Sequence, residues 1–127
     1  KLSHFALAPT AARTADLDGT AVDLVEYEGD IIVILDVEAG GTSTLDVKLQ
    51  SSDTSGGSYT DVTAVFDLNG TEQASAAVAF AQVSTSDSKQ YLVFPRGDAK
   101  RFIKAVSTTS TSTHTYSINA VGAKKYA

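Results

Sequence analysis

Residues 44–50 read Thr44-Leu45-Asp46-Val47-Lys48-Leu49-Gln50, a strict alternation of polar and apolar side chains. Successive side chains of a strand point to opposite faces of a sheet, so this alternation predicts a strand with one buried and one solvated face. The polar loop 51–58 follows and contains two adjacent glycines, and residues 59–62 are expected to form a short return strand. Together these segments predict a β-hairpin.

The rest of the chain continues this pattern of short strands and turns. Residues 31–37 are apolar and rich in β-branched side chains, which predicts a central strand covered on both faces, by a second sheet or by a sister subunit. A turn is expected just before it, at Glu28-Gly29-Asp30. Further strands are expected over 20–26, 77–83, 91–94, 101–108 and 113–121, with a hairpin between 77–83 and 91–94. Residues 65–68 are expected to continue the return strand 59–62. About eight strands at roughly 8–12-residue spacing predict an all-β fold: a single-domain antiparallel β-sandwich or jelly-roll-like barrel.

Residues 1–18 differ from the segments that follow. They lack alternation and contain Pro9 and several alanines, which predicts an N-terminal arm ahead of a β-sandwich domain at 19–127. A helical turn around residues 10–16 is one option for part of this arm. We expect Leu2, Phe5 and Leu7 to anchor in a groove of a partner or to add to the edge of a sheet. The alternative is a frayed terminus.

Composition limits the class of protein. The 127 residues fit one domain, and the absence of cysteine excludes disulfides and thiolate metal sites. The longest apolar run, Ile31 to Leu35, is far shorter than the ~20 residues that a membrane-spanning helix needs. No signal peptide is visible. We therefore expect no membrane contact.

Charge is unevenly distributed along the chain. Residues 1–88 hold 14 acidic and 3 basic side chains, whereas residues 89–127 hold 7 basic and 1 acidic. Either acidic and basic strands lie side by side, or the subunit has an acidic face and a basic face suited to head-to-tail contact. A pI of about 4.8 argues against a nucleic-acid partner. A second candidate contact region is the basic segment 96–104, with Arg96, Lys100, Arg101 and Lys104.

No pattern in the chain indicates an active site, a metal or a cofactor. His4 and His114 are far apart in sequence and have no metal-ligand spacing. Residues 16–19 hold two aspartates but lack the further ligands of a calcium loop. Nucleophile-elbow, P-loop and dinucleotide motifs are missing, so we expect no enzyme. Tyr59 beside the glycine loop could serve a sugar-binding site, although packing at the start of a strand is the preferred interpretation.

A family resemblance adds to these expectations. Within residues 45–62, an alternating strand leads into Gln50-Ser51-Ser52-Asp53, a glycine turn, and Tyr59-Thr60-Asp61-Val62. This run, with a later strand pattern at 99–106, resembles small structural proteins of tailed bacteriophages.

The resemblance implies a virion protein without catalytic residues, most simply a capsid decoration (cement) protein on the outer surface of the head, made in the host bacterial cytoplasm. It implies the major capsid protein as a partner, and self-association into a homo-oligomer such as a trimer. The alternatives are a head–tail connector or tail structural protein, or a carbohydrate-binding β-sandwich module.

Overall fold

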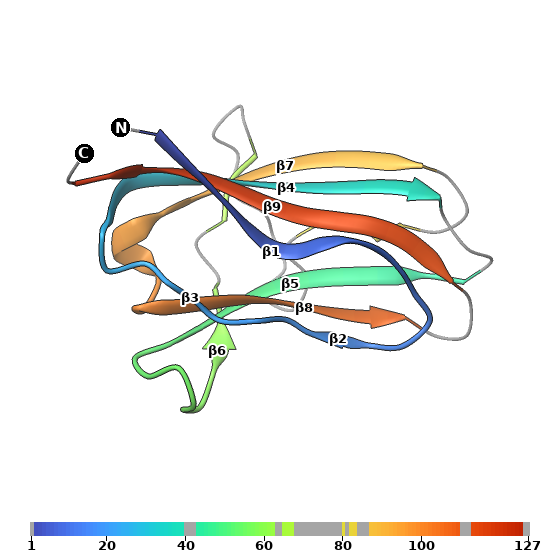
Figure 1. Ribbon diagram of the computed structural model, residues 1–127, viewed down its shortest axis with the longest axis horizontal. Helices are drawn as coiled ribbons and strands as arrows, with labels where there is room; N and C mark the ends of the chain where they lie inside the picture. The colour runs from blue at the N-terminus through green and yellow to red at the C-terminus, as the bar shows by residue number, and fades with distance from the viewer. Residues whose placement is uncertain are drawn as a thin grey trace.

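The computed structural model describes residues 2–39, 43–62, 65–67, 80, 82–83, 87–109 and 113–125. Two antiparallel sheets pack face to face as a sandwich, which confirms the predicted fold class (Figure 1). The first sheet has the order β1-β9-β4-β7, formed by Leu2–Arg13, His114–Lys124, Tyr27–Ala39 and Ser88–Pro95. The second has the order β2-β8-β5-β6, formed by Leu17–Asp18, Phe102–Thr109, Leu45–Ser52 and Thr60–Asp61. The short strand β3, Val22–Asp23, also pairs with β8, and a 3-10 turn, η1, spans Arg96–Asp98.

The core lies between the sheets and follows the alternation seen in the sequence. In β5, Leu45, Val47 and Leu49 are at most 1% exposed. They face inward-pointing residues of β4 such as Ile31 and Leu35, which are fully buried. The predicted hairpin is confirmed, because β5 pairs with β6 through Gln50↔Asp61 and Ser51↔Thr60.

The turn expected at 28–30 is wrong, because β4 runs through it from Tyr27 to Ala39. Gly29 adopts a φ of 72°, and the register of β4 against β9 shifts between Glu28 and Ile32. A glycine with positive φ can accommodate extra residues in one strand without ending the pairing. The glycine signal therefore marks an irregularity within a strand.

The N-terminal segment also differs from its prediction. Residues 2–13 form β1, which pairs with β9 at the edge of the first sheet, so they are neither a free arm nor, at residues 10–13, a helical turn. Two register shifts, between Ala6 and Ala8 and between Ala8 and Ala11, interrupt the pairing. Each bulge changes which side chains face inward, and this explains why no regular alternation was visible.

The hairpin expected between 77–83 and 91–94 is wrong where it can be checked. Val83 bridges Leu45 of β5 in the second sheet, and the Phe80 N–H donates to the Val47 carbonyl 3.2 Å away. Residues 91–94 instead belong to β7 in the first sheet. The strand expected at 65–68 shows a single bridge, from Phe66 to β7. Residues 63–64, 68–79, 81 and 84–86 of this region lie outside the described part of the chain.

A buried polar pair joins the two sheets. The hydroxyls of Ser107 in β8 and Tyr116 in β9 are 2.7 Å apart, and the Leu17 N–H donates to Ser107 Oγ at 3.2 Å.

Within the described residues, no helix has the length and apolar character that crossing a bilayer requires.

Candidate interaction surface

An apolar patch lies in the middle of the outer face of the first sheet. We define it by Ile32 and Ile34 of β4, Tyr91 and Val93 of β7, and Val121 of β9. The register makes these residues direct neighbours, because Ile32 pairs with both Val93 and Val121, and Ile34 pairs with Tyr91. Ile32 is 37% exposed and Tyr91 40% exposed, and the other three are half-buried. A contiguous apolar surface of this kind is typical of a protein contact site.

Polar groups border the patch along the strands. Beyond Tyr91 and Ile34, Lys89 lies 3.7 Å from Asp36 as an exposed ion pair. Asp30 lies opposite Pro95 on the other side of the patch, and Asn119 lies beside Ile34 on β9. An apolar centre with a polar border is the usual anatomy of a protein–protein interface.

The outer face of the second sheet is different in character. Lys48 of β5 and Asp61 of β6 form an ion pair at 3.1 Å, and the Gln50 amide donates to the same carboxylate at 3.0 Å. The hydrogen bond from Gln50, followed by that from Lys48, lowers the pKa of Asp61 below its usual value. Paired charges of this kind are typical of a surface that faces solvent. The two outer faces of the sandwich are therefore chemically distinct.

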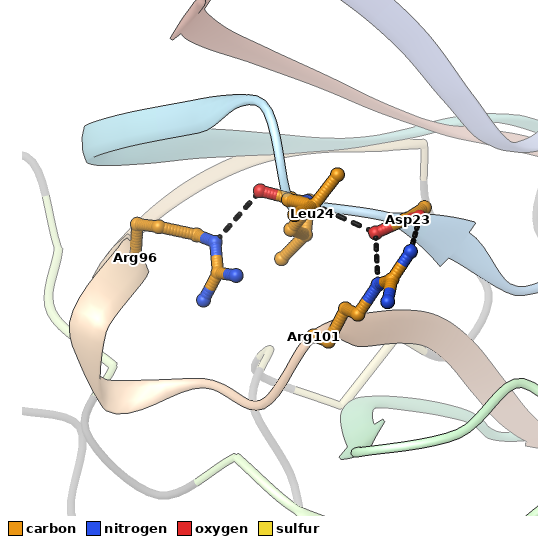
Figure 2. A network of polar contacts seen from close by, with 5 residues as sticks. Asp23, Leu24, Arg96 and Arg101 are labelled. Atoms are coloured by element: carbon orange, nitrogen blue, oxygen red, sulfur yellow. Dashed lines mark hydrogen bonds and ion pairs between the residues drawn. The ribbon is translucent and has the colours of Figure 1, made fainter. Parts of the chain in front are cut away.

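The predicted basic segment is tied to its own chain. Arg96 donates from Nε to the Leu24 carbonyl at 2.9 Å and from Nη1 to the Ala99 carbonyl at 3.0 Å. The Arg101 guanidinium donates two hydrogen bonds to the Asp23 carboxylate, at 3.0 and 2.8 Å, as Figure 2 shows. The hydrogen bond from Arg101 lowers the pKa of the Asp23 carboxyl. These contacts fasten η1 and β8 to the segment around β3.

The other two predicted basic residues are placed differently. Lys104 lies 2.6 Å from Asp18 and 4.2 Å from the centre of the Tyr59 ring, and its side chain is only 15% exposed. Lys100 is exposed. The segment 96–104 thus contributes three cations that already have partners within the chain, and its role in binding another protein stays a prediction.

The three predicted anchors of the N-terminal segment also separate. Leu2 is 73% exposed, whereas Leu7 is 2% exposed and belongs to the core. Phe5 packs on the Tyr27 ring with 5.0 Å between centroids. The expectation of Leu7 as an external anchor is wrong, because Leu7 lies on the inward face of β1, with Ser3 and Phe5, and belongs to the core. Leu2 keeps the exposure that a contact needs.

Sequence reasoning did not identify the apolar patch as a site. Residues 31–37 are apolar on both faces, which indicated an apolar outer face on this strand. Only the strand register shows that Tyr91, Val93 and Val121 complete the patch.

The described residues offer little for catalysis or metal binding. No group of three or more His, Asp or Glu among them could hold a metal ion. His114 is fully buried at the start of β9. A shallow depression of about 370 Å³ lies at the ends of β4 and β7, and it is lined mainly by Asp36, Glu38, Asp87 and Lys89. The expectation that the chain is not an enzyme stays a prediction.

The tyrosine that sequence reasoning weighed as a sugar contact packs locally. The Tyr59 hydroxyl donates to the Ser55 carbonyl at 2.8 Å, and Lys104 covers its ring.

Comparison with known proteins gives no sequence family: no family model matches the chain, and no curated protein matches it. Solved structures do match. The SPBc2 prophage-derived protein YomS superposes with a TM-score of 0.56 at 14% identity, over 96% of this chain and 92% of that one. The shared property is the β-sandwich fold.

Two further structures show the same fold within longer chains. A chain of the infectious bursal disease virus Gx strain matches with a TM-score of 0.57 at 12% identity, over 99% of this chain. The Clostridium thermocellum endo-1,4-β-D-xylanase 10B (CBM22-1-GH10 modules, complexed with xylohexaose) matches with a TM-score of 0.51 at 10% identity, over the whole of this chain. This chain spans 33% of the viral chain and 25% of the xylanase chain.

Proposed function

We propose that this chain is a structural protein of a tailed-phage virion, and more narrowly a capsid decoration (cement) protein that binds the assembled head. The observation that carries the proposal is the apolar patch on one face of a sandwich whose other face carries paired charges. Such a molecule has a docking side and a solvent side. The resemblance of residues 45–62 and 99–106 to phage structural proteins, and the fold shared with a prophage protein and a viral chain, support the same interpretation.

In this proposal the apolar patch packs on the major capsid protein and the outer face of the second sheet points to solvent. The patch of five side chains is small, so one contact would be weak. A shell offers the same site many times, and a second contact on one lattice is effectively intramolecular. A small self-associating subunit can therefore hold neighbouring capsid proteins together although each patch binds modestly.

The first experiment is quantitative mass spectrometry of purified virions, with the major capsid protein as the reference. About one copy per capsid protein, or a comparable fixed ratio, supports a decoration role. A handful of copies per particle supports the connector or tail role instead. Absence from the particle overturns the virion proposal.

The second experiment tests the patch with particles that lack the protein. The double variant Ile32→Thr/Tyr91→Ser should weaken binding to these shells by about tenfold or more, since central apolar contacts dominate interface energies. Val106→Thr, on the outer face of β8 opposite Lys48, is the matched control and should bind normally. Equal binding by both variants would place the contact elsewhere.

The shared fold of a xylanase chain supports a second candidate, a carbohydrate-binding module. Tyr91 is the exposed aromatic side chain of the patch and could stack on a sugar ring. This candidate predicts glycan binding that is lost in Tyr91→Ala and kept in Tyr59→Phe. A glycan array without any signal would remove it.

A further inference from the structure

β1 is the outermost strand of the first sheet, and its two halves differ as sheet edges. Residues 2–6 pair with β9 in unbroken register, from Leu2↔Ala123 to Ala6↔Asn119. On the side away from β9, no strand of the described chain pairs with β1. Among the described residues, the outward peptide groups of residues 2–6 thus have no strand partner and can accept a further strand.

The second half of β1 is closed to such pairing. Pro9 has no N–H to donate, and two register shifts bend the strand. Arg13 donates to the carbonyls of Pro9 and Ala11, so these acceptors are occupied within the chain. Its guanidinium also bonds the Tyr116 carbonyl at 2.8 Å and lies 4.6 Å above the Tyr116 ring, which fixes it in place. Proline, bulges and charge are the usual devices that protect an edge strand.

The first half carries none of these devices. Residues 2–6 read Leu2-Ser3-His4-Phe5-Ala6, without proline, lysine, arginine or acid. Leu2 at its start is 73% exposed. A strand protected along one half and open along the other has a defined docking edge.

We propose that residues 2–6 pair antiparallel with the same segment of a second copy of this chain, about a two-fold axis at His4. The segment is self-complementary around that residue. Leu2 then lies opposite the partner's Ala6, and Ser3 lies opposite the partner's Phe5, so each pair sets a large side chain beside a small one. Identical edges that pair in this way form a closed two-fold interface that leaves no further open edge of the same kind.

The dimer would join two first sheets into one continuous sheet. A two-fold axis that relates antiparallel strands of one sheet is perpendicular to the sheet, so both apolar patches lie on the same side. A bivalent docking face results, and its second contact gains from the first. The dimer itself does not depend on a virion role, because it concerns the isolated protein.

His4 at the axis makes the dimer sensitive to charge. In the monomer it is exposed, and the β9 residues around it are Val121, Asn119 and Ala123, none of which titrates. The nearest charged residue along β9, Lys124, lies 3.6 Å from Glu26. The group that faces His4 is thus the partner's His4, and a charged side chain placed at this position in both copies would repel its counterpart across the axis.

Sedimentation equilibrium of the purified chain, at about 5 to about 300 µM, measures the dimer directly in the range expected for a small interface. The wild type should dimerise, and His4→Lys should raise the dissociation constant by about fivefold or more, because like charges then face each other across the axis. His4→Val adds no charge and should dimerise like the wild type.

Thr10→Lys is the matched control, since it adds the same charge to the protected half of β1 and should leave dimerisation unchanged. Unfolding temperatures of all variants should match the wild type, because positions 4 and 10 are exposed. A monomer at every concentration, or a His4→Lys dimer as tight as the wild type, would overturn the proposal. Either result would leave the virion proposal intact, because copy number and shell binding test that separately.

Discussion

At the scale of single residues, Gly19 shows how tightly the segment after β1 lies on the second sheet. A Cβ at this position would be 2.6 Å from the Ala105 carbonyl oxygen and 3.3 Å from that of Leu7. Gly19 N–H also donates to the Ala105 carbonyl at 2.9 Å, so the backbone cannot retreat without losing this bond. Gly19→Ala should therefore lower the free energy of unfolding by about 1–3 kcal/mol in urea titrations. Gly97→Ala, with nothing within 4 Å, is the control and should be close to neutral.

The buried pair of Ser107 and Tyr116 permits a second test at this scale. Tyr116→Phe removes a hydroxyl from the 2.7 Å contact between the sheets and should cost about 1–2 kcal/mol. The same change should cost clearly less in a Ser107→Ala background, because the partner is then already absent. A double-mutant cycle in chemical denaturation measures this coupling. Additive losses would mean that the hydroxyl pair does not contribute to joining the sheets.

Some of these residue roles could be predicted from the sequence and others could not. The inward faces of Leu45, Val47 and Leu49 followed from alternation, because β5 is a regular strand. Leu7 was misplaced because residues 1–18 were expected to form an arm, and only the pairing with β9 shows that they form a strand with an inward face. Arg96 and Arg101 looked like surface cations because their partners, Leu24 and Asp23, are more than 70 residues away in sequence.

At the scale of elements, two arginines hold η1 and β8 against the segment around β3 but differ in environment (Figure 2). Arg96 is half-buried and bonds two backbone carbonyls, whereas the Arg101 side chain is 51% exposed. Arg96→Ala should cost about 1–2 kcal/mol, because bonds from a charged donor to buried acceptors are lost. Arg101→Ala should cost less than about 1 kcal/mol, as for other exposed ion pairs. Thermal unfolding of the two variants would test this order, and the reverse order would contradict it.

The carboxylates of Asp23 on β3 and Asp61 on β6 make the stability of the second sheet depend on pH. Both have a folded pKa below the ordinary value of 3.8, chiefly through hydrogen bonds from Arg101 and Gln50 respectively. A lowered folded pKa gives stability that is complete above 3.8 and is lost as the pH falls through the folded value. When the pH is lowered below 3.8, the unfolding temperature of the double variant Asp23→Asn/Asp61→Asn should therefore fall less than that of the wild type. An acid response identical to that of the wild type would show that these contacts do not matter for stability.

At the scale of the whole molecule, the sequence could predict a sandwich but not the assignment of strands to sheets. Alternation and turn residues are local properties, and they indicated strands near β4, β5, β7, β8 and β9 but not β1 or β2. Which sheet a strand joins depends on pairings between distant segments. Val83 and β7 are close in sequence, yet Val83 bridges the second sheet whereas β7 belongs to the first. Phe66 follows β6 of the second sheet but bridges β7 of the first. The apolar patch is a product of those pairings, which is why no single segment revealed it.

The two faces of the first sheet should respond differently to the same substitution. Ile31 and Ile32 are adjacent in β4, but Ile31 is fully buried and Ile32 is 37% exposed. Ile31→Thr should cost about 3 kcal/mol or more, because it places a hydroxyl in the core and removes a buried methyl group. Ile32→Thr should cost about 1 kcal/mol or less, since its side chain already meets solvent. Urea titration measures the free energy of unfolding of both variants, and equal losses would contradict the prediction.

The comparison of these two variants is also a test of the docking face. If Ile32→Thr were as costly as Ile31→Thr, the chain itself would cover the outer face of the first sheet, and no partner could use the apolar patch. If Ile32→Thr were nearly neutral for folding yet weakened binding to particles, the patch would serve association and not stability. A surface that keeps isoleucine, valine and tyrosine without needing them for folding is best explained by a partner that covers it.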